Sequence, residues 1–376
     1  MQYSIEDLVR LAKRENNTAR PYLYVNPKQG KHIPTDPQET LAMCAALANK
    51  VNETYPNDAL YVIGFAETAT GIASGISRFL KNVVFYQNTT REYKEGEKYL
   101  YFTESHSHAQ DQMLRSAGIE DYVCEIDRIL LIDDEVTTGR TICKLIDAIK
   151  NNYQVENVKY SIVSVLNSMT PDRIAELEKA DIDCIYLTSI PYEYGKEDII
   201  RIPVDNSLHH VTESNMPLNL KEICFECDSN PRGIVSFSEY QMDNMKFAEL
   251  VINRFKGKHY NRMLVLGTEE FMYPTICVGE ALELSGIADQ VRIHSTTRSP
   301  IVAYDSVNYP LKQRYQLRSF YDVERTTYLY NLEAYDGVLI LTDGFNYKQG
   351  LSDLCDYLSQ LGNKTIFLGR WKYKEA

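Results

Sequence analysis

The chain has 376 residues, more than one ordinary core needs and about the size of two domains. Hydrophobic residues make up 44% and charged residues 24%, so the chain can build a packed core and bulk disorder is excluded. With 52 acidic and 40 basic residues the net charge is −12, which argues against general nucleic-acid binding but allows a local basic pocket. No apolar run reaches the roughly 18 residues of a membrane helix, and the N-terminus has no signal-peptide pattern. We therefore expect a cytoplasmic protein without nucleic-acid or membrane partners.

The first half of the chain predicts alternating strands and helices. Asp36, Pro37 and Glu39 form a capping pattern that predicts a helix over 35–51. Short apolar runs predict buried strands, and apolar residues at helical spacing predict the helices between them. The strand segments are 59–63, 83–86, 128–132, 158–166 and 183–188. The alternation is typical of an α/β fold with an open, mostly parallel sheet, interrupted by a polar β-excursion over 87–121.

An internal repeat divides the chain. Three short sequence motifs recur in the same order, and the spacings between them differ by only a few residues. The pairs are 60–67 (LYVIGFAE) with 263–270 (MLVLGTEE), 88–91 (NTTR) with 295–298 (STTR), and 129–134 (ILLIDD) with 339–343 (LILTD). We expect two related α/β domains over 1–215 and 216–376, with the polar stretch 227–233 as the linker.

The strongest chemical signal is the segment 129–141 (ILLIDDEVTTGRT). Its buried strand delivers Asp133 and Asp134 to the carboxyl end, where ligands of open α/β sheets bind. A tight loop then opens a helix, and its amides and hydroxyls can converge on one phosphate. The loop residues are Thr137, Thr138, Gly139, Arg140 and Thr141. Carboxylates beside such a loop predict a site for a phosphorylated ribose; the alternative is a simple turn with solvated acids.

This segment resembles the phosphoribosyl pyrophosphate signature of type I phosphoribosyltransferases: four apolar residues, two acids and a Thr/Gly loop. Other segments resemble the phosphoribosyltransferases found beside bacterial tellurite-resistance genes. They are 20–32, 64–71 (GFAETATG), 88–91 (NTTR) and 102–108 (FTESHSH). The second half carries TRSP at 297–300, the tetrapeptide that gives a C-terminal TRSP domain its name.

The resemblance implies two tandem phosphoribosyltransferase-like folds, the second degenerate. It also implies Mg²⁺-dependent transfer from phosphoribosyl pyrophosphate to a nitrogen of a base or nucleoside-like acceptor, or the reverse, through an oxocarbenium-like transition state. A biosynthetic or stress-associated role and a homodimer are further implications. The alternative is a non-catalytic sensor of phosphoribosyl pyrophosphate. Regulatory relatives usually add a DNA-reading segment, and its absence from this sequence favours the enzyme.

The resemblance also implies roles for individual residues. Asp133 and Asp134 would hold the ribose hydroxyls and face the developing positive charge, while the loop 137–141 would bind the ribose phosphate. The pyrophosphate loop would comprise Ala66, Glu67, Thr68, Ala69 and Thr70. Arg91 is the best-placed cation for the leaving group. Glu67 stands where relatives often have a basic residue, so it is either a Mg²⁺ or ribose contact or a helix cap.

The polar excursion holds a second group of candidates, Glu104, His106 and His108. The two histidines are two residues apart, so on an extended segment they face the same side. They are candidates for acceptor recognition or for removing the proton of the attacking nitrogen. Metal binding and a solvated loop are the alternatives, and the metal ligands stay unassigned. Arg20, Lys28 and His32 either close over the same pocket or lie on the surface.

The second copy is weaker as an active site. One acid follows its third strand instead of two, and 344–350 lacks the compact Thr/Gly loop. Its remaining candidates are Glu269, Glu270, Thr297, Arg298 and Asp343. We expect a repurposed small-molecule site; a purely structural domain is the alternative. The only CxxC pair, Cys224 and Cys227, lacks zinc partners at suitable spacing, so we expect idle thiols.

Overall fold

The computed structural model describes residues 2–15, 17, 20–102, 112–153, 155, 157–191, 193–203, 208–209 and 220–374. The chain forms two compact units. Unit 1 comprises Met1–Ile5, Leu41–Glu193 and Asp228–Asp243, and unit 2 comprises Glu6–Thr40, Tyr194–Cys227 and Asn244–Ala376. Each unit thus takes segments from both halves of the sequence. The domain division at 215/216 remains a prediction.

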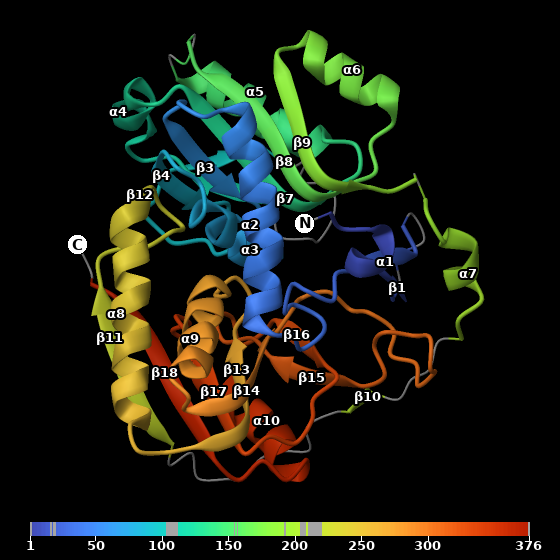
Figure 1. Cartoon of the computed structure of the whole chain (residues 1–376), viewed down its shortest axis with the longest axis vertical. Coiled ribbons are helices and arrows are strands. Elements are labelled where there is room, and N and C mark those ends of the chain that lie inside the picture. Colours follow the sequence, from blue (N-terminus) through green and yellow to red (C-terminus); the bar gives the residue numbers. More distant parts are fainter. Residues whose placement is uncertain are drawn as a thin grey trace. The chain divides into compact units, whose positions relative to one another are not determined.

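Unit 1 is built on a six-stranded sheet with the order β12-β4-β3-β7-β8-β9 (Figure 1). All neighbouring strands are parallel except β12 (Val235–Ser236), which runs antiparallel to β4. The parallel strands are β4 (Val83–Asn88), β3 (Leu60–Gly64), β7 (Arg128–Val136), β8 (Lys159–Asn167) and β9 (Ile182–Ser189). Strand β3 is buried along its whole length, as an apolar strand covered on both faces must be. The predicted parallel α/β sheet is confirmed.

Helices pack against this sheet through apolar stripes. In α5 the side chains of Ile142, Leu145, Ile146 and Ile149 are buried, which is the face that the sequence predicts. Burial of each such side chain contributes about 1.5–3 kcal/mol relative to exposure. Helix α3 packs on β3 and β7. The elements are α2 (Pro37–Thr54), α3 (Ala69–Ser77), α4 (Ile119–Tyr122), a 3-10 turn (Val123–Glu125), α5 (Arg140–Asn152), α6 (Pro171–Lys179), and the antiparallel pair β5 (Tyr99–Tyr101) and β6 (Met113–Arg115).

Part of the segment 227–233, which the sequence predicts as a linker, lies along β4, and its role as a linker stays a prediction. Asn88 donates its main-chain N–H to the Pro231 carbonyl at 2.6 Å, and the Gln87 side-chain amide donates to the Arg232 carbonyl at 3.1 Å. β12 then continues the pairing. An edge strand presents unpaired N–H and C=O groups, so an extended neighbour satisfies them whatever its side chains are. Composition alone therefore did not reveal this role.

Unit 2 contains a five-stranded, fully parallel sheet with the order β11-β18-β17-β13-β14. Its strands are β11 (Lys221–Cys227), β18 (Ile366–Tyr373), β17 (Gly337–Thr342), β13 (Tyr260–Gly267) and β14 (Ala288–Ser295). A smaller sheet has the order β10 (Leu208–His209), β15 (Arg314–Arg318), β16 (Thr326–Tyr330). The other elements are α1 (Ile5–Leu8), β1 (Arg10–Lys13), β2 (Tyr22–Val25), α7 (Lys196–Ile200), α8 (Phe237–Phe255), α9 (Tyr273–Leu284) and α10 (Tyr347–Gln360); α1, α2 and α8 each begin in one unit and end in the other.

The two sheets share one topology, as the sequence repeat predicts. The order β4-β3-β7-β8 in unit 1 corresponds to β14-β13-β17-β18 in unit 2. The connections also correspond: α3 and α9 follow the first strand, and α5 and α10 follow the third. A small β-pair, β5–β6 or β15–β16, interrupts each copy before that third strand. The degeneracy of the second copy stays a prediction.

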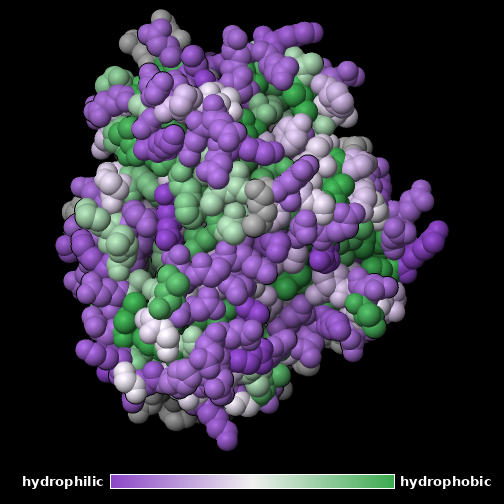
Figure 2. Space-filling view, viewed as in Figure 1, coloured by the Kyte–Doolittle hydropathy of each residue, from purple (hydrophilic) through white to green (hydrophobic). Residues whose placement is uncertain are grey.

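None of the helices in the described parts of the chain combines the length and the apolar character needed to cross a bilayer. Hydrophilic side chains cover most of the face shown in Figure 2.

The end of β3 requires a residue without a side chain. A Cβ atom on Gly64 would lie 2.6 Å from the Cβ of Ala73 and 2.7 Å from Oδ1 of Asn88. We expect Gly64→Ala to lower the free energy of unfolding by about 1–3 kcal/mol, as overpacking does. Urea denaturation followed by circular dichroism measures this loss. Gly233→Ala is the control, because the nearest atom to its Cβ would be 3.7 Å away; equal stability of the two variants would contradict the close packing.

Candidate functional site

Three of the predicted segments meet at one edge of the unit 1 sheet. Gly64, the last residue of β3, is in register with Asn88 on β4 and with Ile132 on β7. The carboxyl ends of parallel strands lie at the same edge, so residues 65–70, 89–91 and 133–141 emerge there together. This is the edge at which open α/β sheets bind ligands.

The two adjacent acids lie within the last residues of β7, which continues to Val136. Both are half-buried, and the Asp134 N–H donates to Oδ1 of Asp133 at 2.9 Å. Burial, followed by the neighbouring Asp134 carboxylate, raises the pKa of Asp133 well above its usual range. Two carboxylates held so closely are mutually unfavourable until cations or hydroxyl donors reach them. The acids are therefore suited to accept hydrogen bonds from a sugar or to face positive charge.

The loop after β7 is fixed through its carbonyl oxygens. Ser168 donates its main-chain N–H to the Val136 carbonyl at 2.9 Å, and the Cys143 N–H donates to the Gly139 carbonyl at 2.9 Å. The Nε of Arg173 donates to the Thr138 carbonyl at 3.0 Å. Gly139 has a φ of +66°, a left-handed conformation that residues with a side chain rarely adopt.

The amides of this loop, by contrast, have few internal partners. Among the described residues, the N–H groups of Thr137, Thr138, Gly139 and Thr141 have no hydrogen-bond partner, and the Arg140 N–H makes one long contact, 3.4 Å, to Oγ1 of Thr138. A cluster of unbonded amides at the start of a helix attracts anions, since the helix dipole is positive there. The arrangement can therefore bind a phosphate group without a charged side chain.

The loop after β3 is held from two sides. Ala66 donates its N–H to the Thr89 hydroxyl at 2.8 Å, and Gln112 donates its side-chain amide to the Ala66 carbonyl at 2.9 Å. The Thr70 hydroxyl donates to the Glu67 carbonyl at 3.1 Å, and the peptide bond between Ala66 and Glu67 is cis. Helix α3 starts at Ala69, with Thr68 at its N-cap position. Sequence reasoning missed Gln112 and Arg173, because neither belongs to a motif.

The other predicted residues are placed as follows. Arg91 follows β4 at the same sheet edge and is half-buried. Glu104, His106 and His108 lie outside the described residues. Arg20, Lys28 and His32 belong to unit 2. There Arg20 lies over the Tyr22 ring, Lys28 pairs with Glu39 at 3.1 Å, and His32 is buried against Tyr330.

In unit 2 the corresponding edge contains a buried ion network around Glu269. This carboxylate is fully buried and accepts from Arg298 Nε at 2.7 Å and from Arg325 at 3.0 Å. The Ser319 hydroxyl donates to its second oxygen. The buried Lys31 ammonium donates to the Glu269 main-chain carbonyl at 2.6 Å, and Arg298 also lies 3.6 Å from Glu270.

The remaining unit 2 candidates also have internal partners. Asp343 accepts hydrogen bonds from the hydroxyls of Tyr321 and Tyr373, the latter at 2.8 Å. Thr297 exchanges two main-chain hydrogen bonds with Tyr328, at 2.9 and 2.7 Å. The second-copy side chains that the sequence assigns to a crevice thus contact other protein groups, and a ligand site there stays a prediction.

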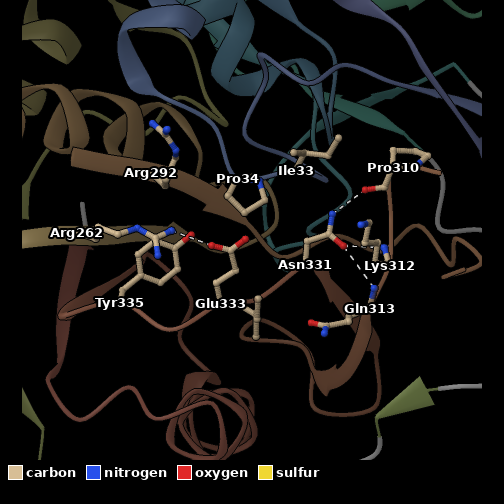
Figure 3. A pocket seen from close by; sticks show the side chains of 11 residues that line it. Ile33, Pro34, Arg262, Arg292, Pro310, Lys312, Gln313, Asn331, Glu333 and Tyr335 are labelled. Atoms are coloured by element: carbon tan, nitrogen blue, oxygen red, sulfur yellow. Dashed lines mark hydrogen bonds and ion pairs between the residues drawn. The ribbon is translucent and has the colours of Figure 1, made fainter. Parts of the chain in front are cut away.

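A separate pocket of about 390 Å³ lies within unit 2 (Figure 3). Its two arginines form ion pairs: Arg262 pairs with Glu333 at 2.8 Å, and Arg292 pairs with Asp36 at 3.3 Å. In Figure 3 the Asn331 side chain points toward the 310–313 segment; it accepts from the Lys312 N–H at 2.8 Å. This pocket is mixed in charge, and its geometry favours no ligand class.

The described residues contain neither a cluster of metal ligands nor a disulfide. Within the described ranges, no group of three His, Cys, Asp or Glu side chains is placed to hold a metal ion. All eight cysteines are free thiols, with Cys224 exposed and Cys227 buried. The CxxC pair therefore forms no disulfide.

Models of known protein families match both halves of the chain. Residues 8–189 match a family model described as phosphoribosyl transferase, and residues 238–358 match the TRSP domain found C-terminal to it. No curated protein matches.

Solved structures that match include three phosphoribosyltransferases. The adenine phosphoribosyltransferase from Trypanosoma brucei, in complex with AMP, pyrophosphate and ribose-5-phosphate, is 11% identical, with a TM-score of 0.35; the match covers 49% of this chain and 77% of that chain. The adenine enzyme from Thermoanaerobacter pseudethanolicus is 15% identical (TM-score 0.34; 50% and 98%). A hypoxanthine enzyme from Staphylococcus aureus is 18% identical (TM-score 0.27; 44% and 79%).

The Glu269 network predicts a large loss of stability when its central charge is removed. Glu269→Gln leaves Arg298 and Arg325 without their shared counter-charge. We therefore expect the free energy of unfolding of unit 2 to fall by about 3–5 kcal/mol. Urea denaturation followed by the fluorescence of Trp371, the single tryptophan and buried in unit 2, measures the loss. The control is Glu222→Gln, which removes an exposed pair with Arg370 and should cost at most about 1 kcal/mol. Similar denaturation midpoints for both variants would refute the network.

The raised pKa of Asp133 predicts a pH-dependent gain in stability on mutation. The folded protein holds the Asp133 proton more tightly than the unfolded chain, so protonation contributes stability at low pH that is lost as pH rises through the folded pKa. Asparagine resembles the protonated form. We expect Asp133→Asn to melt at a higher temperature than native protein at neutral pH. The difference between the two melting temperatures should narrow as pH falls. Asp147→Asn, at an exposed position of α5, is the control; a gain independent of pH would contradict the assignment.

Proposed function

Because the chain belongs to the phosphoribosyltransferase family with a C-terminal TRSP domain, we propose that unit 1 transfers the phosphoribosyl group of phosphoribosyl pyrophosphate to a nitrogen of a base or nucleoside-like acceptor. The observation that carries the proposal is the meeting of an acid pair and an unbonded amide loop at one sheet edge. The resemblance to proteins encoded beside tellurite-resistance genes supports a biosynthetic role in that setting.

The loop 137–141 is the proposed site of the ribose 5-phosphate group. Its amides at the start of α5 can donate to several phosphate oxygens at once, and the positive end of the helix dipole stabilises the dianion. The pyrophosphate group would then lie toward the loop 66–70 and Arg91. Arg91 supplies positive charge as the leaving group departs.

Asp133 and Asp134 are proposed to accept hydrogen bonds from the ribose hydroxyls. As the bond from the anomeric carbon to pyrophosphate lengthens, the sugar ring gains positive charge. Two carboxylates beside the ring stabilise that charge more than they stabilise the neutral sugar, so they lower the barrier. Ionised acids are needed for this role, and the cationic transition state itself favours their ionisation.

The donor set of this edge fits Mg²⁺. Carboxylate oxygens are the hard ligands that this ion prefers, and Mg²⁺ commonly uses one or two of them together with water and substrate phosphates. Asp133 and Asp134 are the residues that would hold it directly or through water. When bound, the ion would neutralise charge on the pyrophosphate. The acceptor would be recognised by the polar excursion 87–121, to which the sequence assigns Glu104, His106 and His108.

The acid pair provides the test of this function. We expect the double variant Asp133→Asn/Asp134→Asn to lose at least about 100-fold in pyrophosphate release from phosphoribosyl pyrophosphate, because a charge-stabilising pair is removed. The assay uses the full chain, Mg²⁺ and pooled cell metabolites as acceptors. Asp172→Asn, an exposed acid of α6, should keep full activity.

Two outcomes would count against the proposal. Undiminished turnover in the double variant would refute the assignment of the acids. Tight binding of phosphoribosyl pyrophosphate by the native protein, without turnover across a broad acceptor pool, would identify a sensor instead of an enzyme.

A further inference from the structure

One side chain from a different helix contacts the proposed phosphate loop. Arg173 lies in the first turn of α6, where its N–H donates to the Thr170 cap at 3.3 Å. Its guanidinium uses separate nitrogens for three partners: Nε donates to the Thr138 carbonyl at 3.0 Å, and the other two contact Cys143 Sγ at 3.3 Å and Glu176 at 3.0 Å. The guanidinium thus lies against both the loop and the first turn of α5.

The contact with the Thr138 carbonyl determines where the next amide points. In a trans peptide the C=O and the following N–H point in opposite directions. A Thr138 carbonyl directed at Arg173 therefore directs the Gly139 N–H away from α6. That N–H has no hydrogen-bond partner among the described residues, and Gly139 has the left-handed φ of +66°. The orientation of this amide thus depends on one guanidinium contact.

The other two carbonyl contacts of the loop come from the main chain. Ser168 and Cys143 donate their N–H groups to the carbonyls of Val136 and Gly139. A side-chain substitution leaves these contacts in place. Replacing Arg173 should therefore release the Thr138–Gly139 peptide alone, while the strand end and the start of α5 remain fixed.

We propose that Arg173 is a positioning residue for the ribose-phosphate site: it orients the Gly139 amide toward the phosphate without contacting substrate. This rests on the proposed function of unit 1. The long-range charge of the guanidinium is partly cancelled by Glu176, so the geometry of the contact, and not attraction of the phosphate, is the main effect. Arginine suits the role because its planar fork can bind the carbonyl and the thiol together, which a lysine ammonium on a flexible stem does not reproduce.

The test compares Arg173→Gln and Arg173→Lys with native protein and with Glu176→Gln. Full-length proteins are titrated calorimetrically with ribose 5-phosphate and, separately, with pyrophosphate, and the KM for phosphoribosyl pyrophosphate is measured beside kcat. We expect both Arg173 variants to bind ribose 5-phosphate about 10-fold more weakly, with a similar rise in KM, as loss of one well-oriented charged-group hydrogen bond predicts. Pyrophosphate affinity should stay within about twofold of native, and Glu176→Gln should match native protein throughout.

Each other outcome has a definite meaning. If Arg173→Lys keeps native affinity while Arg173→Gln loses it, the residue acts through charge and the positioning role is wrong. Equal weakening of ribose 5-phosphate and pyrophosphate would indicate general damage to unit 1 and would also overturn the role. If both variants bind as native protein does, the inference fails while the proposed function stands. If native protein neither binds ribose 5-phosphate nor turns over phosphoribosyl pyrophosphate, the proposed function itself fails.

Discussion

The parallel register of β3, β4 and β7 is the constraint on which the unit 1 site depends. It places three strand ends at one edge, so short loops bring residues far apart in sequence within reach of one ligand. Gly64 permits the close approach of α3 at this edge. None of the three loops has to be long, and each is tied to a neighbour by hydrogen bonds. The sheet therefore already holds the residues of the candidate site together.

In the second copy, the polar groups at the corresponding sheet edge bind each other. At the position that aligns with Ala66, unit 2 has Glu269, whose carboxylate is surrounded by two guanidinium groups and a hydroxyl. At the third strand end, Asp343 accepts from two tyrosine hydroxyls. A ligand for this edge would have to replace these ion pairs and hydrogen bonds, and removing one partner of a buried ion pair costs several kcal/mol. Shared topology therefore does not by itself imply a shared site.

Local patterns were sufficient to predict the strands and the loop of unit 1. Buried parallel strands appear in the sequence as continuous apolar runs. The loop after β7 is marked by the acid Asp134 and by Gly139, whose left-handed φ favours glycine. Contacts made by long side chains were beyond such reasoning: Arg173 reaches Thr138 across 35 residues, and Gln112 reaches Ala66 across 46. Glu269 illustrates the same limit, because its sequence position suggests a crevice and only packing reveals two arginines around it. The pairing of 231–236 with β4 had no signal, since main-chain hydrogen bonds do not depend on residue type.

The proposed recognition of a phosphorylated sugar by an acidic chain poses a physical problem. With a net charge of −12, the protein as a whole repels a multiply charged anion, although salt at physiological strength screens this beyond about 8 Å. Main-chain amides avoid the problem because they are neutral donors that act at contact distance and need no neighbouring countercharge. Their strength depends on direction, so the loop must be held in one conformation. Gly139 has a φ of +66°, and the Arg173 guanidinium contacts the Thr138 carbonyl. In the proposed site, the positions of the carbonyls are therefore as important to phosphate binding as the amides themselves.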